Sequence, residues 1–132
     1  RRFTGKKNMY RKPSVMVVDD DPILRSLTTG IMRNAEYDVV AECSSGEAAL
    51  KQIGDIKPGL VLLDINLPGT DGITLIDQIK ALEKPPVIVM MSSEATMDRV
   101  RGALGKGAKG FVVKPFNAAR LLSSVEAALK DC

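Results

Sequence analysis

The fold is decided by the segment Val15-Met16-Val17-Val18-Asp19-Asp20-Asp21, in which a short apolar run ends abruptly in three acids. Three later apolar runs also end at polar residues, and they are Leu60-Val61-Leu62-Leu63 before Asp64, Val87-Ile88-Val89-Met90-Met91 before Ser92-Ser93, and Phe111-Val112-Val113 before Lys114. Continuous apolar runs of this length, rich in Val and Ile, predict strands that are buried on both faces. A more mixed run, Val39-Val40-Ala41, lies between two acids and is typical of an edge strand.

Amphipathic patterns typical of helices fill the stretches between these runs. Pro22 suits the first turn of a helix that follows the three acids. Apolar residues then recur at helical spacing in five stretches, which are residues 23–31, 48–53, 73–82, 97–104 and 121–129. Glycines at 102, 105 and 107 interrupt or follow the fourth stretch. An interior glycine costs roughly 0.8–1 kcal/mol relative to Ala, so we expect this helix to be the least stable element.

The alternation of strands and helices predicts an α/β fold, a doubly wound, open (βα)5 parallel sheet with right-handed crossovers and helices on both faces. The carboxyl ends of the strands meet at one rim of such a sheet, and ligands bind there. The polar residues that end the apolar runs all lie at strand carboxyl ends, and they are Asp19–Asp21, Asp64, Ser92–Ser93 and Lys114. We therefore expect these side chains to converge, and this convergence is the functional signal.

Length and composition narrow the function classes. The chain has 132 residues, which is room for one domain at roughly 100–200 residues per domain. It contains no histidine, which excludes His-based nucleophilic catalysis, His-ligated metals and a phosphohistidine on this chain. Two cysteines, Cys43 and Cys132, form neither a disulfide framework nor a zinc site. Any metal must therefore bind through oxygen, which favours Mg²⁺, Mn²⁺ or Ca²⁺.

The net charge of +3 conceals two parts of opposite sign. Residues 1–12 contain six basic residues and no acid, whereas the rest of the chain holds all 16 acids against 13 basic residues. We interpret residues 1–13 as a basic tail or linker and residues 14–131 as the folded domain. The tail could contact nucleic acid or an acidic surface, or remain a solvated linker, but we expect the domain itself to bind neither nucleic acid nor a membrane. Without a signal segment or an apolar run of about 20 residues, we predict a cytoplasmic location.

Carboxylates, a lysine and a hydroxyl at one rim indicate phosphoryl chemistry. Carboxylates packed together repel one another and raise each other's pKa, and a hard divalent cation relieves that repulsion. A set of oxygen ligands with few protein contacts is typical of Mg²⁺, with Mn²⁺ as a substitute. Lys114 and the hydroxyl of Ser92 would face the oxygens of a phosphoryl group next to one carboxylate.

Four motifs together carry a family resemblance. They are Val17-Val18-Asp19-Asp20-Asp21-Pro22, Leu62-Leu63-Asp64-Ile65-Asn66-Leu67-Pro68-Gly69-Thr70-Asp71-Gly72, Met91-Ser92-Ser93-Glu94 and Val113-Lys114-Pro115-Phe116. In order and in spacing, the chain resembles the receiver domain of response regulators in bacterial two-component signalling, chemotaxis regulators included, over about residues 14–131. The resemblance implies a flavodoxin-like strand order of 2-1-3-4-5 and a signalling domain rather than a turnover enzyme.

The resemblance also implies roles for individual residues. Asp64 would accept a phosphoryl group from a phosphohistidine on a partner histidine kinase or phosphotransfer protein. Asp20 would be a direct Mg²⁺ ligand, Asp19 would bind the ion mainly through water, and Asp64 with the backbone carbonyl of Asn66 would complete the protein ligands.

Further roles follow from the same resemblance. Ser92 and Lys114 would contact phosphoryl oxygens, and Phe111 would be the aromatic switch residue that moves inward with Ser92. Ser92 is favoured by its separation from Lys114, while Ser93 stays an alternative. The bond between Lys114 and the following proline would be cis. Asp21 we interpret as a helix-start acid that the helix dipole stabilises.

The predicted function is a phosphorylation-activated switch. Phosphorylation of Asp64 would change the face made by the fourth helix, fifth strand and fifth helix, where an output domain or effector would bind and a phosphorylated homodimer could form. The alternative is a docking module that has the receiver fold but is not phosphorylated. A hydrolase of the haloacid dehalogenase type is disfavoured because Asn66 stands where that family has its second acid, and no Gly-rich loop indicates nucleotide binding.

Overall fold

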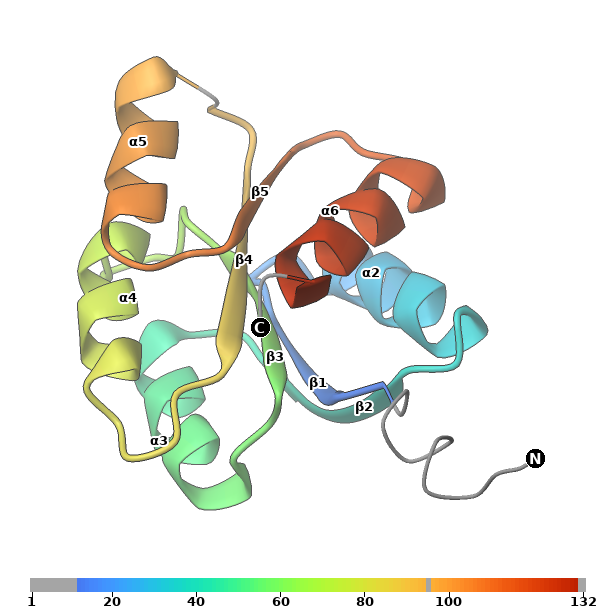
Figure 1. Cartoon of the computed structure of the whole chain (residues 1–132), viewed down its shortest axis with the longest axis horizontal. Coiled ribbons are helices and arrows are strands. Elements are labelled where there is room, and N and C mark those ends of the chain that lie inside the picture. Colours follow the sequence, from blue (N-terminus) through green and yellow to red (C-terminus); the bar gives the residue numbers. More distant parts are fainter. Residues whose placement is uncertain (1–11, 95, 131–132) are drawn as a thin grey trace.

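In a computed structural model that describes residues 12–94 and 96–130, five parallel strands form one sheet in the order β2-β1-β3-β4-β5 (Figure 1). The strands are β1 (Ser14–Val18), β2 (Asp38–Cys43), β3 (Leu60–Asp64), β4 (Val87–Ser92) and β5 (Gly110–Val113). A helix follows each strand, and these helices are α2 (Pro22–Asn34), α3 (Gly46–Ile56), α4 (Gly72–Lys80), α5 (Met97–Gly105) and α6 (Ala118–Lys130). The predicted fold class and strand order are confirmed.

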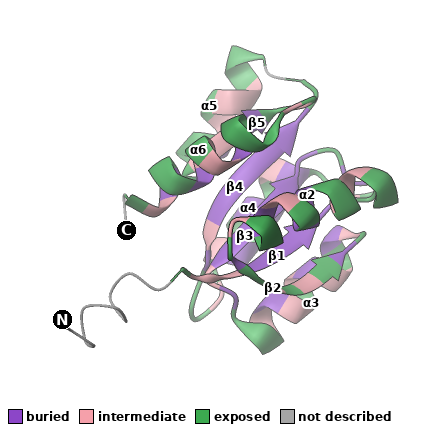
Figure 2. Cartoon of the chain, turned by 90° about the vertical axis from the view of Figure 1, so that its right-hand side faces the viewer, coloured by how far each residue is buried: buried purple, intermediate pink, exposed green. Residues whose placement is uncertain are grey.

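The helices cover both faces of the sheet. Helices α3, α4 and α5 lie on one face, and α2 and α6 lie on the other (Figure 1). Successive strand side chains point to opposite faces, so β1 sends Met16 and Val18 into the core under α3 to α5 and Val15 and Val17 into the core under α2 and α6. The central strands therefore lie buried between two helical layers (Figure 2).

Burial on both faces is confirmed for the inner strands and wrong for β5. Every residue of β3 is buried, and so are all but the first residues of β1 and β4. In β5, Val112 is buried, but Phe111 is only half-buried and Val113 is 43% exposed. The physical reason is position, because β5 is an edge strand that pairs with β4 alone. The mixed run at Val39 forms β2 at the opposite edge, as predicted.

Acidic caps start two of the helices near the carboxyl ends of the strands. Asp21 Oδ1 accepts hydrogen bonds from the backbone N–H groups of Ile23 at 3.0 Å and Leu24 at 3.3 Å, which confirms its interpretation as a helix-start acid. Asp71 caps α4 in the same way. Such caps satisfy N–H groups that have no partner within the helix.

The two ends of the chain are described only in part. Residues 1–11 of the predicted tail and residues 131–132 lie outside the described residues. Lys12 contacts the domain, because its Nζ donates to the carbonyl of Ala35 and lies 4.7 Å from the ring centroid of Tyr37. Among the described helices, none is long and apolar enough to cross a bilayer.

Candidate functional site

Parallel pairing places two of the predicted acids next to each other. In the β1–β3 pair, Val18 lies opposite Leu63, so Asp19 and Asp64 follow at the same level of the rim. The backbone N–H of Asp19 donates to the carbonyl of Cys43 at 3.0 Å, which ties the end of β1 to the end of β2. Cys43, the last residue of β2, is itself buried, with 4% exposure.

The same rim carries the predicted hydroxyl and lysine. Ser92 pairs with Val113, the last residue of β5, and Lys114 follows directly. The backbone N–H of Lys114 donates to the carbonyl of Ser92 at 2.8 Å. The peptide bond between Lys114 and Pro115 is cis, as the resemblance implied. The structure therefore brings all four predicted strand ends together.

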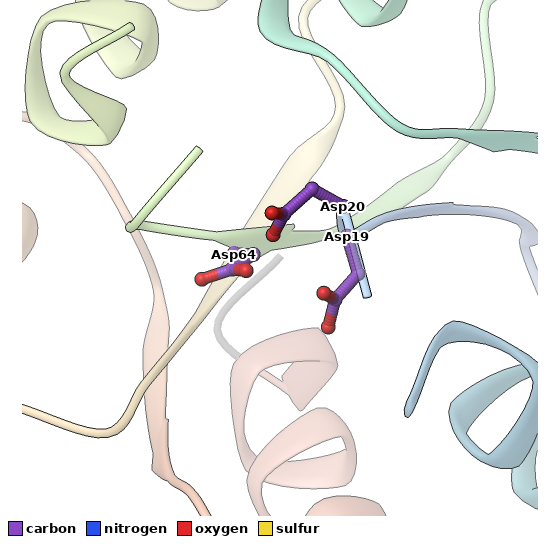
Figure 3. Close-up of side chains that lie close together, drawn as sticks. All are labelled: Asp19, Asp20 and Asp64. Carbon is purple, nitrogen blue, oxygen red and sulfur yellow. The ribbon is translucent and has the colours of Figure 1, made fainter. Parts of the chain in front are cut away.

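Asp19, Asp20 and Asp64 form an acidic cluster at the ends of β1 and β3 (Figure 3). One carboxylate oxygen from each residue lies within 4.8 Å of the others. Asp19 is fully buried, Asp64 is 3% exposed and Asp20 is exposed. The Oδ1 atom of Asp19 accepts from the N–H of Asp21 at 2.9 Å, and Oδ1 of Asp64 accepts from the N–H of Asn66 at 2.9 Å. Backbone N–H groups two residues further along the chain therefore fix the carboxylates of Asp19 and Asp64.

Lys114 supplies the compensating positive charge. Its Nζ lies 3.0 Å from Oδ2 of Asp19 and 3.1 Å from Oδ2 of Asp64, with only 14% of the side chain exposed. A charge pair removed from water in this way depends on good geometry and on both partners being present. Lys114 therefore bridges the two buried acids and leaves Asp20 toward solvent.

Burial raises the pKa of Asp64 above that of an ordinary carboxyl. The N–H of Asn66 and the charge of Lys114 lower this pKa in part, and the charge of Asp19 adds to the rise. A carboxyl whose pKa is raised by folding destabilises the folded state at every pH above that pKa, and the penalty disappears as the pH falls through it. A bound cation would relieve the same penalty at neutral pH.

The residues present fit a divalent cation with oxygen ligands. Three carboxylates offer oxygen atoms from one small volume, and one lysine neutralises only part of their charge. Within residues 12–94 and 96–130, the Asp20 carboxylate has no hydrogen bond or ion pair, so its oxygens are available to a ligand. The acidic cluster is therefore able to bind a metal. The predicted use of the Asn66 carbonyl stays a prediction.

The hydroxyl of Ser92 is engaged locally in this structure. Ser92 is fully buried at the end of β4. Its Oγ accepts from the backbone N–H of Glu94 at 2.9 Å and donates to the carbonyl of Glu94 at 3.3 Å. The neighbouring Ser93 is exposed. Both hydroxyls thus lie at the rim, and the choice of Ser92 stays a prediction.

The loop after β3 has glycines where its geometry requires them. Gly69 has a φ of +70°, a left-handed conformation that side chains rarely adopt. A Cβ on Gly72 would lie 2.6 Å from the backbone of Ile65, so only glycine fits there. These glycines shape the second half of the loop that joins Asp64, at the end of β3, to α4.

Phe111 lies between the core and the surface. Its ring packs against the cluster under α3 to α5. It also lines a surface depression of about 630 Å³, together with Val113, Arg120 and Ser124. A side chain placed in this way has room on one side, but its switching role stays a prediction.

Sequence reasoning missed Arg25. Its guanidinium NH1 donates to the backbone carbonyl of Asp19 at 2.7 Å, and its Nε lies 3.5 Å from Oε1 of Glu42. The only sequence signal is a basic residue one turn into the helix that follows the acids. Nothing in that spacing shows that the side chain turns back to the acidic loop.

Known proteins match this chain over most of its length. Residues 15–126 match the family model described as the response regulator receiver domain. The chemotaxis protein CheY of Listeria monocytogenes is 37% identical over 116 residues, which cover 88% of this chain and 98% of that relative. CheY of Bacillus subtilis is 35% identical over 115 residues, covering 87% and 96%. In the solved CheX–CheY–BeF3–Mg²⁺ complex from Borrelia burgdorferi, one chain superposes with a TM-score of 0.87 and 28% identity, covering 93% of each chain.

The superposition on the solved complex agrees with the receiver fold observed here, a parallel sheet in the order β2-β1-β3-β4-β5. The match to the family model covers the four motifs on which the resemblance rests. The chain therefore belongs to the response regulator receiver domain family of two-component signalling, a family of signalling domains rather than turnover enzymes.

Proposed function

We propose that the chain is a switch activated by Mg²⁺-dependent phosphorylation of Asp64. The observation that carries the proposal is the surroundings of this carboxylate. It lies 3.1 Å from the ammonium of Lys114 and within 4.8 Å of the carboxylate oxygens of Asp19 and Asp20. A fixed positive charge and a set of cation ligands are the two kinds of group that stabilise a phosphoryl group during transfer.

The cation in this proposal is Mg²⁺, with Mn²⁺ as a substitute. Asp19, Asp20 and Asp64 would hold it together with the carbonyl of Asn66. Mg²⁺ keeps several waters and binds proteins through few carboxylates plus phosphate oxygens, which suits a cluster with one exposed member. When bound, it would neutralise charge on the phosphoryl oxygens. The Borrelia burgdorferi complex, which contains BeF3 and Mg²⁺, supports this choice.

The proposed donor is a phosphohistidine, as the family resemblance implies. Because this chain has no histidine, the phosphohistidine would lie on a partner kinase or phosphotransfer protein. A carboxylate oxygen of Asp64 attacks phosphorus while the phosphorus–nitrogen bond breaks. The electron pair of that bond stays on the imidazole nitrogen, which takes a proton from water. The products are an acyl phosphate on Asp64 and an unmodified histidine on the partner. Lys114 then pairs with a phosphoryl oxygen.

The switch in this proposal depends on contacts that exist only after phosphorylation. New phosphoryl oxygens would compete with Glu94 for the hydroxyl of Ser92 and with Asp19 for Lys114. Because these contacts form in one state only, they shift the population toward it. Phe111 would follow Ser92 inward, and the face made by α5, β5 and α6 would change.

The proposed partner surface is this α5–β5–α6 face, where an output domain, an effector or a second phosphorylated copy would bind. Met97, Leu104 and Val113 on α5 and β5 are exposed apolar side chains, with 64%, 46% and 43% exposure. Apolar side chains on the surface are typical of docking sites when they lie close together. Two further expectations stay predictions. One is that residues 1–13 form a basic tail or linker, and the other is that the protein is cytoplasmic.

Acetyl phosphate tests the proposed function without a partner. The intact mass is expected to increase by one phosphoryl group in Mg²⁺ and to stay unchanged in EDTA. A folded chain that gains no phosphoryl group in Mg²⁺ would instead favour the docking module.

Mg²⁺ alone is expected to stabilise the fold. At a free concentration tenfold above its dissociation constant, a ligand of the native state adds about 1.4 kcal/mol to the free energy of unfolding. Urea unfolding followed by circular dichroism measures this gain. Asp20→Asn is expected to abolish it, whereas Asp71→Asn, which changes an exposed acid that caps α4, keeps it. An equal gain in all three proteins would contradict the site.

Phe111→Ala is expected to uncouple the rim from the partner face. Addition of Mg²⁺ and beryllofluoride, a mimic of the phosphoryl group, should shift NMR amide signals at the rim and on α5 in the wild-type chain. In the variant, the rim signals should shift while those of α5 stay near their starting positions. Val113→Ala, on the same strand, serves as the control. Equal α5 shifts in Phe111→Ala and the wild-type chain would contradict the coupling.

A further inference from the structure

We propose that Arg25 is a positioning residue for the cation, an inference that rests on the proposed function. Arg25 NH1 donates to the backbone carbonyl of Asp19 at 2.7 Å, and its Nε lies 3.5 Å from Oε1 of Glu42. Its side chain is 22% exposed. One side chain thus joins α2, the loop of the acidic cluster and the edge strand β2.

The hydrogen bond to the Asp19 carbonyl fixes the direction of Asp20. That carbonyl oxygen belongs to the peptide unit between the two residues, which is planar, so holding the oxygen also holds the nitrogen of Asp20. A hydrogen bond from a guanidinium is charge-assisted and short, and it resists rotation of the peptide. Arg25 therefore acts on Asp20 through the backbone, without touching its carboxylate.

Asp20 depends on this backbone contact more than its neighbours do. Three hydrogen bonds hold Asp19. Its backbone N–H donates to the carbonyl of Cys43, its Oδ1 accepts from the N–H of Asp21, and its Oδ2 accepts from Nζ of Lys114. The carboxylate of Asp20 has no such partner in the part of the chain that the structure describes. The exposed member of the cluster is thus the one whose position rests on its peptide.

Glu42 holds the guanidinium from the other side. It lies on β2 with its side chain 39% exposed, so the ion pair itself contributes little to stability. The ion pair instead orients the Arg25 side chain, because Glu42 fixes the plane of the guanidinium while NH1 donates to the carbonyl of Asp19. Lysine has a single ammonium and cannot contact both partners with the same geometry.

Charge and position predict opposite effects for Arg25, which makes the inference testable. A positive charge near three carboxylates disfavours a cation, so loss of the charge alone would tighten Mg²⁺ binding. Loss of a residue that orients metal ligands weakens binding, typically by about 10–100-fold. Arg25→Met removes both at once, and the direction of the change shows which effect is larger.

The experiment is isothermal titration of Mg²⁺ into the wild-type chain, Arg25→Met, Arg25→Lys and Glu42→Gln. Arg25→Met is expected to weaken binding by about tenfold, and Arg25→Lys to recover only part of it. Glu42→Gln is expected to weaken binding by less. Arg33→Met, which removes an exposed arginine from the last turn of α2, is the matched control and should bind as the wild-type chain does. Circular dichroism confirms that each variant is folded.

Labelling by acetyl phosphate gives a second readout. If Arg25 positions the cation, the slower labelling of Arg25→Met should return to the wild-type rate once Mg²⁺ is raised in proportion to its dissociation constant. Unchanged or tighter Mg²⁺ binding by Arg25→Met would overturn the inference while the proposed function stands. If Arg25→Met does not fold, unchanged binding by Glu42→Gln would overturn it in the same way. A wild-type chain that binds no Mg²⁺ would overturn both.

Discussion

Asp64→Asn is expected to reduce labelling by acetyl phosphate to background in the presence of Mg²⁺. An amide cannot form an acyl phosphate, and the acids that remain, Asp19 and Asp20, have other surroundings. Asp19 is fully buried and bonded to Lys114 and to the N–H of Asp21. Asp20 is exposed, with no ion pair to a lysine among the described residues. Intact-mass spectrometry measures the labelled fraction, and Asp21→Asn, which keeps a residue suited to cap α2, is the matched control.

Loss of the fold does not explain such a result. The pKa of Asp64 is raised by burial, so the ionised side chain destabilises the folded state at neutral pH. Asp64→Asn is therefore expected to unfold in EDTA at a urea concentration at least as high as that of the wild-type chain. Labelling of Asp64→Asn at the wild-type rate would show that another residue accepts the phosphoryl group.

Lys114→Met is expected to have the largest effect on stability. The substitution keeps an apolar stem but leaves two buried carboxylates without the ammonium that lies 3.0 and 3.1 Å from them. Removing one partner of a buried ion pair costs about 3–5 kcal/mol, because the other charge stays buried and unpaired. The free energy of unfolding at neutral pH in EDTA should therefore fall by about this amount.

Two comparisons separate this effect from a general loss of packing. Mg²⁺ should restore part of the lost stability, because a cation at Asp20 and Asp64 compensates the same charges. Lys109→Met removes an exposed lysine just before β5 and should change the free energy of unfolding by about 0.5 kcal/mol or less. If Lys114→Met in EDTA matched Lys109→Met, the bridging role of Lys114 would be contradicted.

The sequence predicts the architecture because strand length, apolar content and polar endings coincide in each repeat. The rim follows from the same pattern, since parallel strands end on one side of a sheet. The exposure of Val113 does not follow from it. An apolar run in an edge strand has the same sequence pattern as one in a central strand. Its burial depends on whether a further strand or helix covers it.

Side-chain partners at the site are less predictable than the positions of the strand ends. Spacing places Lys114 on the rim, but only the three-dimensional arrangement shows that its ammonium bridges Asp19 and Asp64. The local bonding of Ser92 to Glu94 depends on how the chain turns after β4. The sequence pattern does not indicate the role of Arg25, because that role depends on two contacts made only in the folded chain. One is with the carbonyl of Asp19, and the other is with Glu42 on β2.

The central claim, that Asp64 accepts the phosphoryl group, is tested most directly by chemical mapping of the modified residue. The wild-type chain would be incubated with acetyl phosphate in Mg²⁺ and in EDTA, then treated with borohydride, which reduces an acyl phosphate to an alcohol. Tandem mass spectrometry would locate the product. We predict homoserine at position 64 in the Mg²⁺ sample and unmodified Asp64 in EDTA. Reduction at another acid, or a phosphoryl group that resists borohydride because it is an ester of Ser92 or Ser93, would contradict the account.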